Sequence, residues 1–252
     1  MFVAVAYGRE PQAAPTGGVV LPAIPAGSSE ASAPVVAAAA TAGQRPLSNP
    51  NGVSRYMAVL EPVEARATPG GGARVVARLT TRTPEGTTNV VLALARVERG
   101  GQLWIKVRLP ILPNNTTGWI RRESLGGYNT VNTHLVVSTR TLTATLYRFR
   151  KPVFSARIGI GQSRWPTPTG RFYIRNKLTR YSSPTYGPVA FGTSARSAVL
   201  TDWPAGGFVG IHGTNQPGLI PGRISHGCIR LRNADILRLA RLMSPGTPLT
   251  IV

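Results

Sequence analysis

The sequence predicts an all-β protein with two folded modules, a small barrel followed by a β-sandwich that ends with one helix. Glycine and proline account for 28 and 22 of the 252 residues, a content that favours turns and short strands over long helices. Short apolar or alternating segments recur between these turns from Tyr56 onward. Only one segment, close to the C-terminus, has the apolar period of a helix.

Residues 1–53 are predicted to form a flexible tether, because they are rich in Ala, Pro, Gly and Ser and show no strand or helix period. The first six residues, Met1–Ala6, are apolar and end in Ala-Val-Ala, a pattern typical of the end of an export signal. No basic segment precedes them, so we interpret them as the remnant of a truncated signal and expect an exported protein at the cell wall. The alternative is a disordered start of a cytoplasmic chain.

Residues 54–128 are predicted to form the small barrel. Trp104-Ile-Lys-Val-Arg-Leu-Pro leads through a turn to Gly118-Trp119-Ile, which resembles the last strands of bacterial SH3-like domains. Both tryptophans are expected in the core, and strand closure would remove the exposed edges. The expected strands of this module are Arg74–Leu79, Thr88–Ala95, Leu103–Leu109 and Gly118–Arg121.

Residues 132–252 are predicted to form the β-sandwich and the helix. The helix is expected at Asn233–Met243, with Asn233 or Asp235 as N-cap, an apolar stripe that includes Leu237, and a stop at Ser244-Pro-Gly246. It should pack beneath the segment around Cys228. The expected strands are His134–Ser138, Thr141–Tyr147, Val153–Ile160, Arg171–Asn176, Val189–Thr193, Phe208–His212 and Pro248–Val252.

The net charge of +20 (29 basic and 9 acidic residues) indicates a polyanionic environment, either nucleic acid or an anionic cell-wall polymer. Basic residues are scattered, and the densest tract is Arg148-Phe-Arg-Lys151. The chain has no zinc-finger spacing and no aromatic RNA-binding motif. We therefore expect anionic wall polymer, and no nucleic acid, as a partner.

The chemistry-bearing residues gather near the C-terminus. Cys228 is the only cysteine, so it forms no disulfide within the chain, and His212 lies 16 residues before it. Glycines and prolines in the intervening loop allow the chain to fold back and bring them together. A thiol beside a base is a nucleophile, and the amides of Gly227 and Cys228 are candidate oxyanion donors. These parts together predict acyl transfer through a thioester.

Several motifs of the predicted β-sandwich, residues 132–252, together resemble a known family. Gly159-Ile-Gly161, Thr167-Pro-Thr-Gly170, Tyr186-Gly187-Pro, Ile211-His-Gly-Thr and Ser225-His-Gly-Cys-Ile-Arg occur in an order similar to the YkuD-type catalytic domain of L,D-transpeptidases. The resemblance implies a YkuD-type sandwich that cleaves a peptidoglycan stem peptide before a terminal D-amino acid. It also implies that the carbonyl of Gly213 orients the His212 ring.

Other residues of the segment are candidates for substrate contact. Arg230 offers a guanidinium for substrate carboxylates. His226 lies two positions before Cys228 and is expected to tune the thiol or contact substrate. Ser225 is expected mainly to stabilise the turn, and Tyr186 and Trp203 either wall the peptide groove or pack in the sandwich.

The sequence favours an L,D-transpeptidase that forms 3-3 cross-links without cofactor or metal, with two alternatives. An L,D-carboxypeptidase would use water in place of the amine acceptor, and a non-catalytic wall-binding protein would keep only the fold. A zinc site built from His212, His226 and Cys228 is disfavoured, because no fourth ligand is close in sequence. The pattern does not determine the acceptor or the oligomeric state.

Overall fold

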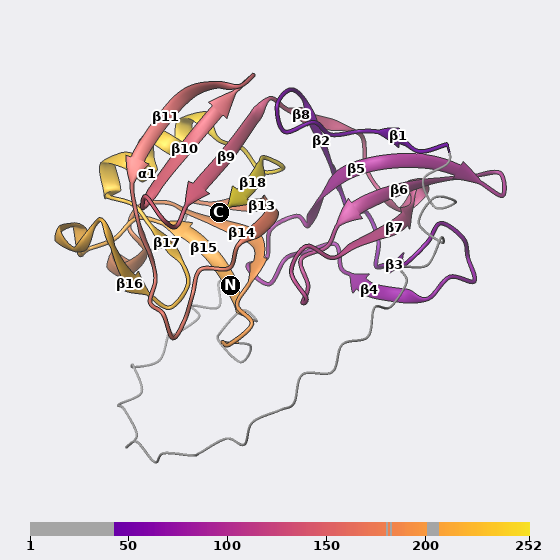
Figure 1. Cartoon of the computed structure of the whole chain (residues 1–252). Helices are drawn as coiled ribbons and strands as arrows, with labels where there is room; N and C mark the ends of the chain where they lie inside the picture. Colours follow the sequence, from indigo (N-terminus) through magenta and orange to yellow (C-terminus); the bar gives the residue numbers. More distant parts are fainter. Residues whose placement is uncertain (1–42, 180, 182, 201–206) are drawn as a thin grey trace, which may run out of the picture. The chain divides into compact units, whose positions relative to one another are not determined.

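The computed structural model describes residues 43–252 apart from residues 180, 182 and 201–206. Residues 43–252 form one compact unit, whose described part holds two β-sheets and a single α-helix (Figure 1), which confirms the all-β class. The signal remnant and most of the predicted tether lie outside the described residues. Structure begins before residue 54, because Arg45–Pro46 pairs with a later strand and Leu47 is buried. No helix in the described part is long and apolar enough to span a membrane.

The first sheet has the strand order β4-β3-β7-β6-β5-β2-β8, with β1 added to β5, and all its pairs are antiparallel. Trp104 and Trp119 are buried, as expected for core residues. The SH3-like assignment of this module stays a prediction. Its strands are β1 (Arg45–Pro46), β2 (Ser54–Ala58), β3 (Val63–Arg66), β4 (Val75–Leu79), β5 (Val90–Arg99), β6 (Gln102–Arg108), β7 (Thr117–Arg121) and β8 (Asn129–Val131).

The second sheet has the order β11-β10-β9-β18-β13-β14-β15-β17-β12-β16. Strand β13 joins its two halves, because residues 170–173 pair with β18 and residues 174–178 pair with β14. The strands are β9 (Thr133–Ser138), β10 (Thr143–Arg148), β11 (Lys151–Arg157), β12 (Gly159–Gly161), β13 (Gly170–Leu178), β14 (Ala190–Arg196), β15 (Phe208–His212), β16 (Gly222–Ser225), β17 (Ile229–Arg230) and β18 (Pro248–Ile251).

One expected strand, Val153–Ile160, is divided between β11 and β12. The backbone N–H of Ile158 donates to the carbonyl of Leu142, and after this point the chain leaves β10 to pair with β16 and β17. The break takes Gly159–Gly161 to the strands that flank Cys228. Apolar residues occur on both sides of the break, so the sequence pattern does not reveal it.

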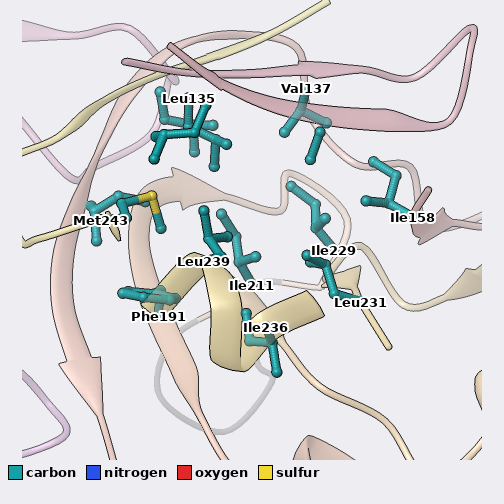
Figure 2. Close-up of a cluster of buried hydrophobic side chains, with 14 of the residues drawn as sticks. Leu135, Val137, Ile158, Phe191, Ile211, Ile229, Leu231, Ile236, Leu239 and Met243 are labelled. Atoms are coloured by element: carbon teal, nitrogen blue, oxygen red, sulfur yellow. The ribbon is translucent and has the colours of Figure 1, made fainter. Parts of the chain in front are cut away.

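The helix α1 spans Asn233–Leu242 and packs its apolar face into the main core. Figure 2 shows Ile236, Leu239 and Met243 against side chains from several strands. Two details differ from the sequence prediction. Arg232 occupies the N-cap position without a side-chain cap, and Leu237 is 41% exposed instead of being part of the buried stripe.

Candidate active site

Cys228 immediately precedes β17 (Ile229–Arg230), a short strand that runs parallel to β15. The register pairs Ile211 with Ile229 and His212 with Arg230. This pairing places Cys228 opposite Gly210, whose backbone N–H donates to the sulfur at 3.3 Å. A backbone donor at this distance favours the thiolate over the thiol.

A tight turn formed by Ser225–Gly227 presents Cys228. Gly227 has a φ of 115°, which favours glycine. The hydroxyl of Ser225 accepts a hydrogen bond from Gly227 N–H at 3.1 Å and donates to the carbonyl of Cys228 at 2.6 Å. Ser225 is only 1% exposed, so its hydroxyl serves the turn and is not placed to contact substrate.

The hydrogen bonds of this turn change the expected oxyanion donors. The Gly227 amide, one of the two expected donors, is engaged by Ser225. None of the hydrogen bonds found among the described residues uses the Cys228 amide. Thr167, which the sequence analysis quotes as part of a motif but without a role, fixes the other side of the turn. Its hydroxyl donates to the Gly227 carbonyl at 2.8 Å and accepts from Gly161 N–H at 2.9 Å.

His212 ends β15 and is 2% exposed. Its Nδ1 lies 2.6 Å from the carbonyl oxygen of Gly213, the contact that the family resemblance implies. A carbonyl oxygen only accepts hydrogen bonds, so Nδ1 carries the proton in this contact. In the neutral ring Nε2 is therefore left with a lone pair that can accept a proton.

Burial dominates the electrostatics of both groups. It lowers the pKa of His212 to about 4, while the Gly213 carbonyl opposes this shift and Arg230 adds to it. Burial also raises the pKa of the Cys228 thiol, although the Gly210 N–H and Arg230 act in the opposite direction. Both groups are therefore neutral at pH 7, as a thiol and an imidazole.

The thiol and the imidazole share the space in front of Gly210. A Cβ atom at Gly210 would lie 3.8 Å from the Cys228 sulfur and 3.9 Å from Cδ2 of His212. Tyr186 bounds the same region, because its ring centroid lies 4.6 Å from that of His212. The other candidate wall residue, Trp203, lies outside the described residues.

The segment after His212 is held by the start of α1. The side-chain oxygen of Asn233 accepts a hydrogen bond from Thr214 N–H at 2.9 Å. A Cβ on Gly213 would collide with this same oxygen, so the position requires glycine. Asn233 thus acts on the loop that supplies the Gly213 carbonyl, instead of capping the helix as its sequence position suggested.

Arg230 and His226 flank Cys228 in different ways. Arg230 follows in β17, and its buried Nε has no hydrogen-bond partner within the described part of the chain. This buried donor is open to a ligand acceptor. His226 is partly exposed and packs its ring on Trp165, with ring centroids 4.0 Å apart.

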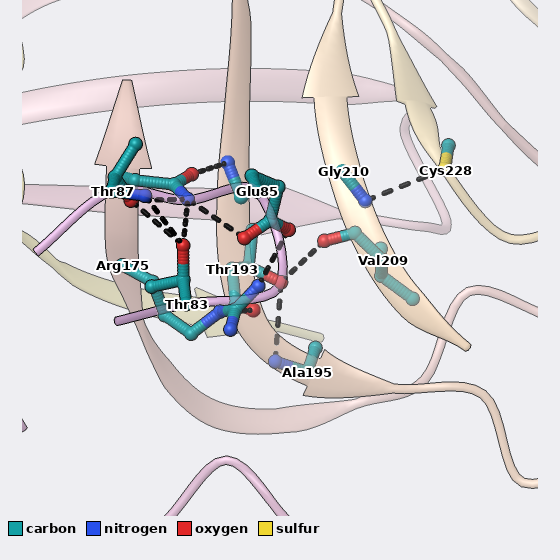
Figure 3. A network of polar contacts seen from close by, with 11 residues as sticks. Thr83, Glu85, Thr87, Arg175, Thr193, Ala195, Val209, Gly210 and Cys228 are labelled. Atoms are coloured by element: carbon teal, nitrogen blue, oxygen red, sulfur yellow. Dashed lines mark hydrogen bonds and ion pairs between the residues drawn. The ribbon is translucent and has the colours of Figure 1, made fainter. Parts of the chain in front are cut away.

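A polar network supports β15 from the first module (Figure 3). Glu85 accepts hydrogen bonds from Arg175 at 2.9 Å and from Asn176 at 3.0 Å. Arg175 also donates from Nε to the carbonyl of Thr193. The hydroxyl of Thr193 in turn donates to the carbonyl of Val209 at 2.6 Å. The next residue along the chain is Gly210, so the network ends at the strand that contacts the thiol.

Comparison with known proteins identifies this domain. The model of the YkuD family, described as the L,D-transpeptidase catalytic domain, matches residues 132–251. YkuD of Bacillus subtilis (strain 168) is 34% identical to the chain over 122 residues, which cover 48% of this chain and 67% of that protein. The chain belongs to the YkuD family of L,D-transpeptidase catalytic domains.

Two further similar proteins match smaller or equal parts of this chain. YcfS of Escherichia coli (strain K12) is 34% identical over 86 residues, covering 34% of this chain and 27% of that protein. Among solved structures, the catalytic domain of an E. faecium L,D-transpeptidase is 26% identical, with 48% of this chain and 96% of that chain covered and a TM-score of 0.37. The family assignment rests on the sequence similarity to YkuD of Bacillus subtilis.

The two motifs that carry the YkuD resemblance, His212-Gly-Thr and Ser225–Arg230, therefore meet where β15 and β17 lie side by side. Within the described ranges, no group of three or more His, Cys, Asp and Glu side chains is arranged to hold a metal ion. The site thus consists of a thiol, a neutral imidazole, backbone donors and one guanidinium.

Proposed function

We propose that the protein is a cysteine acyltransferase that forms 3-3 cross-links between peptidoglycan stem peptides. The observation that carries the proposal is the arrangement around Gly210, which brings the Cys228 sulfur and the His212 ring to one space. The family assignment supports peptidoglycan stem peptides as the substrate class. An exported, wall-facing location and an anionic wall polymer as partner belong to the same proposal.

In the first half-reaction Cys228 attacks the carbonyl of the third residue of the donor stem, whose amide bond leads to the terminal D-amino acid. Nε2 of His212 accepts the thiol proton as the S–C bond forms, which suits a thiol and an imidazole that are both neutral at pH 7. The Cys228 amide is the proposed oxyanion donor. Collapse of the intermediate breaks the C–N bond, and His212 returns the proton to the departing amine of the D-amino acid.

In the second half-reaction an amine of an acceptor stem attacks the thioester. His212 takes a proton from this amine, a new amide bond forms, and the C–S bond breaks. His212 then gives the proton to the sulfur, which restores the thiol and the neutral imidazole. Arg230 is proposed to hold a carboxylate of the substrate, because its buried Nε lacks a partner. Water in place of the amine would give the carboxypeptidase reaction through the same acyl-enzyme.

Mass spectrometry of products tests the proposal. The protein is incubated with disaccharide-tetrapeptide muropeptides beside a Cys228→Ser control. We expect a cross-linked dimer that lacks one terminal D-Ala, absent with the control. Tripeptide alone would favour the carboxypeptidase, and no product at all would favour a non-catalytic wall-binding protein.

A further inference from the structure

The turn between β10 and β11 is built in an unusual way. Arg148 pairs with Lys151, so the hairpin turns through only two residues, Phe149 and Arg150. Their φ angles are 48° and 68°, both in the left-handed region. Two-residue hairpin turns of this kind strongly prefer Asn-Gly or Gly-Gly, because bulky residues are strained there.

A second two-residue hairpin turn in this chain has the same conformation but is made of glycines, which are not strained there. The β5–β6 hairpin pairs Arg99 with Gln102 and turns through Gly100 and Gly101, at φ angles of 58° and 68°. The two turns share a backbone conformation but differ in residue type. A strained Phe-Arg pair where glycine would suffice indicates that the side chains themselves have a use.

The chemistry of the side chains at this turn indicates a ligand that is both anionic and ring-shaped. Phe149 is 55% exposed, and the cations Arg148, Arg150 and Lys151 around it are exposed as well. None of the three cations takes part in an ion pair among the described residues. An exposed aromatic face beside guanidinium groups suits a sugar ring that carries acidic groups.

The hairpin tip also lies between two hollows of the surface. One has a volume of about 370 Å³ and is lined by Arg148, Phe149, Arg241 and the polar residues Asn132, Thr133 and Ser244, among others. The other, of about 280 Å³, is lined by Tyr147, Arg150 and His134, among others. No Asp or Glu is found among the described residues that line either hollow.

The tip is anchored over the first hollow, because Phe149 N–H donates to the carbonyl of Asn132 at 3.3 Å. In the sheet order, β9, β18, β13 and β14 lie between β10 and the strand β15 of the thiol site. The tip with its hollows is therefore a surface separate from the candidate active site.

We propose that the Arg148–Lys151 tip and the two hollows beside it bind a polysaccharide that carries carboxylate or phosphate groups. Arginine side chains on both sides would pair with the acidic groups, Phe149 would pack on a sugar ring, and the hydroxyl and amide groups of the first hollow would bind sugar hydroxyls. A membrane surface is disfavoured, because a membrane-binding element usually presents several apolar side chains together and this turn presents a single aromatic ring. Binding here does not depend on the proposed acyl transfer.

The decisive variant is Phe149→Asn with Arg150→Gly, which installs the preferred turn pair. Relief of strain should raise Tm by about 4 °C. The affinity for dextran phosphate and for polygalacturonate, measured by fluorescence anisotropy at physiological salt, should fall about tenfold or more. Arg99→Asn, which removes one charge beside the Gly100–Gly101 turn, is the matched control and should leave both affinities unchanged.

Three further probes separate the sources of binding. Neutral dextran provides rings without charge, inorganic polyphosphate provides charge without rings, and phosphatidylglycerol vesicles provide an anionic membrane. We expect each to bind more weakly than dextran phosphate or polygalacturonate, the stronger of which identifies the acidic group. Tighter binding to vesicles, or equal losses in the control variant, would overturn the proposal. So would a turn variant that is stabilised but binds like the native protein, or one whose Tm falls.

Discussion

Acidification should destabilise the folded protein through His212. The pKa of this residue is lowered from 6.5 to about 4 by burial, whereas in the unfolded chain it keeps its ordinary value. Between these two pH values the unfolded state binds more protons than the folded state. The contribution of the neutral His212 to stability is therefore fully present above pH 6.5 and is lost as the pH falls toward 4. With about 1.4 kcal/mol for each unit of pKa difference, His212 alone should lower the free energy of unfolding by about 3 kcal/mol at pH 4.

Urea denaturation at pH 7 and at pH 4 measures this effect, with His212→Gln as the matched variant. Glutamine does not titrate, and all the other titratable groups are the same in the two proteins, so the difference between the two pH dependences isolates His212. We expect the free energy of unfolding to fall more steeply in the native protein, by about 3 kcal/mol. Equal pH dependences would refute the claim that a buried, neutral imidazole stands beside Cys228.

Substitutions at three positions test how the site is held. Gly210→Ala should lower kcat/KM about tenfold or more, because the added methyl group enters the space beside the sulfur. Its Tm should be unchanged, because the atom nearest to this methyl group would be 3.6 Å away. Asn233→Ala should cost about 1–2 kcal/mol in urea denaturation and lower kcat, whereas Asn233→Asp keeps the acceptor for Thr214 N–H. Glu85→Ala should cost about 3 kcal/mol, because it leaves the buried Arg175 guanidinium without its carboxylate. An unchanged denaturation midpoint in either of the last two variants, or native activity in the first, would contradict these roles.

Local patterns were sufficient to predict the all-β class of the fold and the approach of His212 to Cys228. The apolar period between Asn233 and the Ser244-Pro-Gly246 stop located α1, and alternation located β15 as Phe208–His212. The glycines and prolines after Thr214 predicted that the chain folds back. The structure brings His212 and Cys228 to the same space beside Gly210.

Local sequence patterns could not predict the contacts between segments that are distant in the chain. Thr167 supports Gly227 from 60 residues away, and nothing in its local sequence marks that role. The parallel pairing of β15 with β17 brings Gly210 N–H to the sulfur, but β17 has only two residues and leaves no periodic signal. The side chain of Asn233 serves the loop after His212 instead of its own helix, because tertiary hydrogen bonding there replaces local capping.

The most direct test of the central claim is the mass of the intact protein after brief incubation with a disaccharide-tetrapeptide donor and acid quenching. The account predicts an added mass equal to the donor minus its terminal D-Ala, localised to Cys228 by peptide mapping. The adduct should be absent in Cys228→Ser and should form much more slowly in His212→Gln. A native protein that releases D-Ala while the adduct is absent or lies on another residue would contradict thioester catalysis at Cys228.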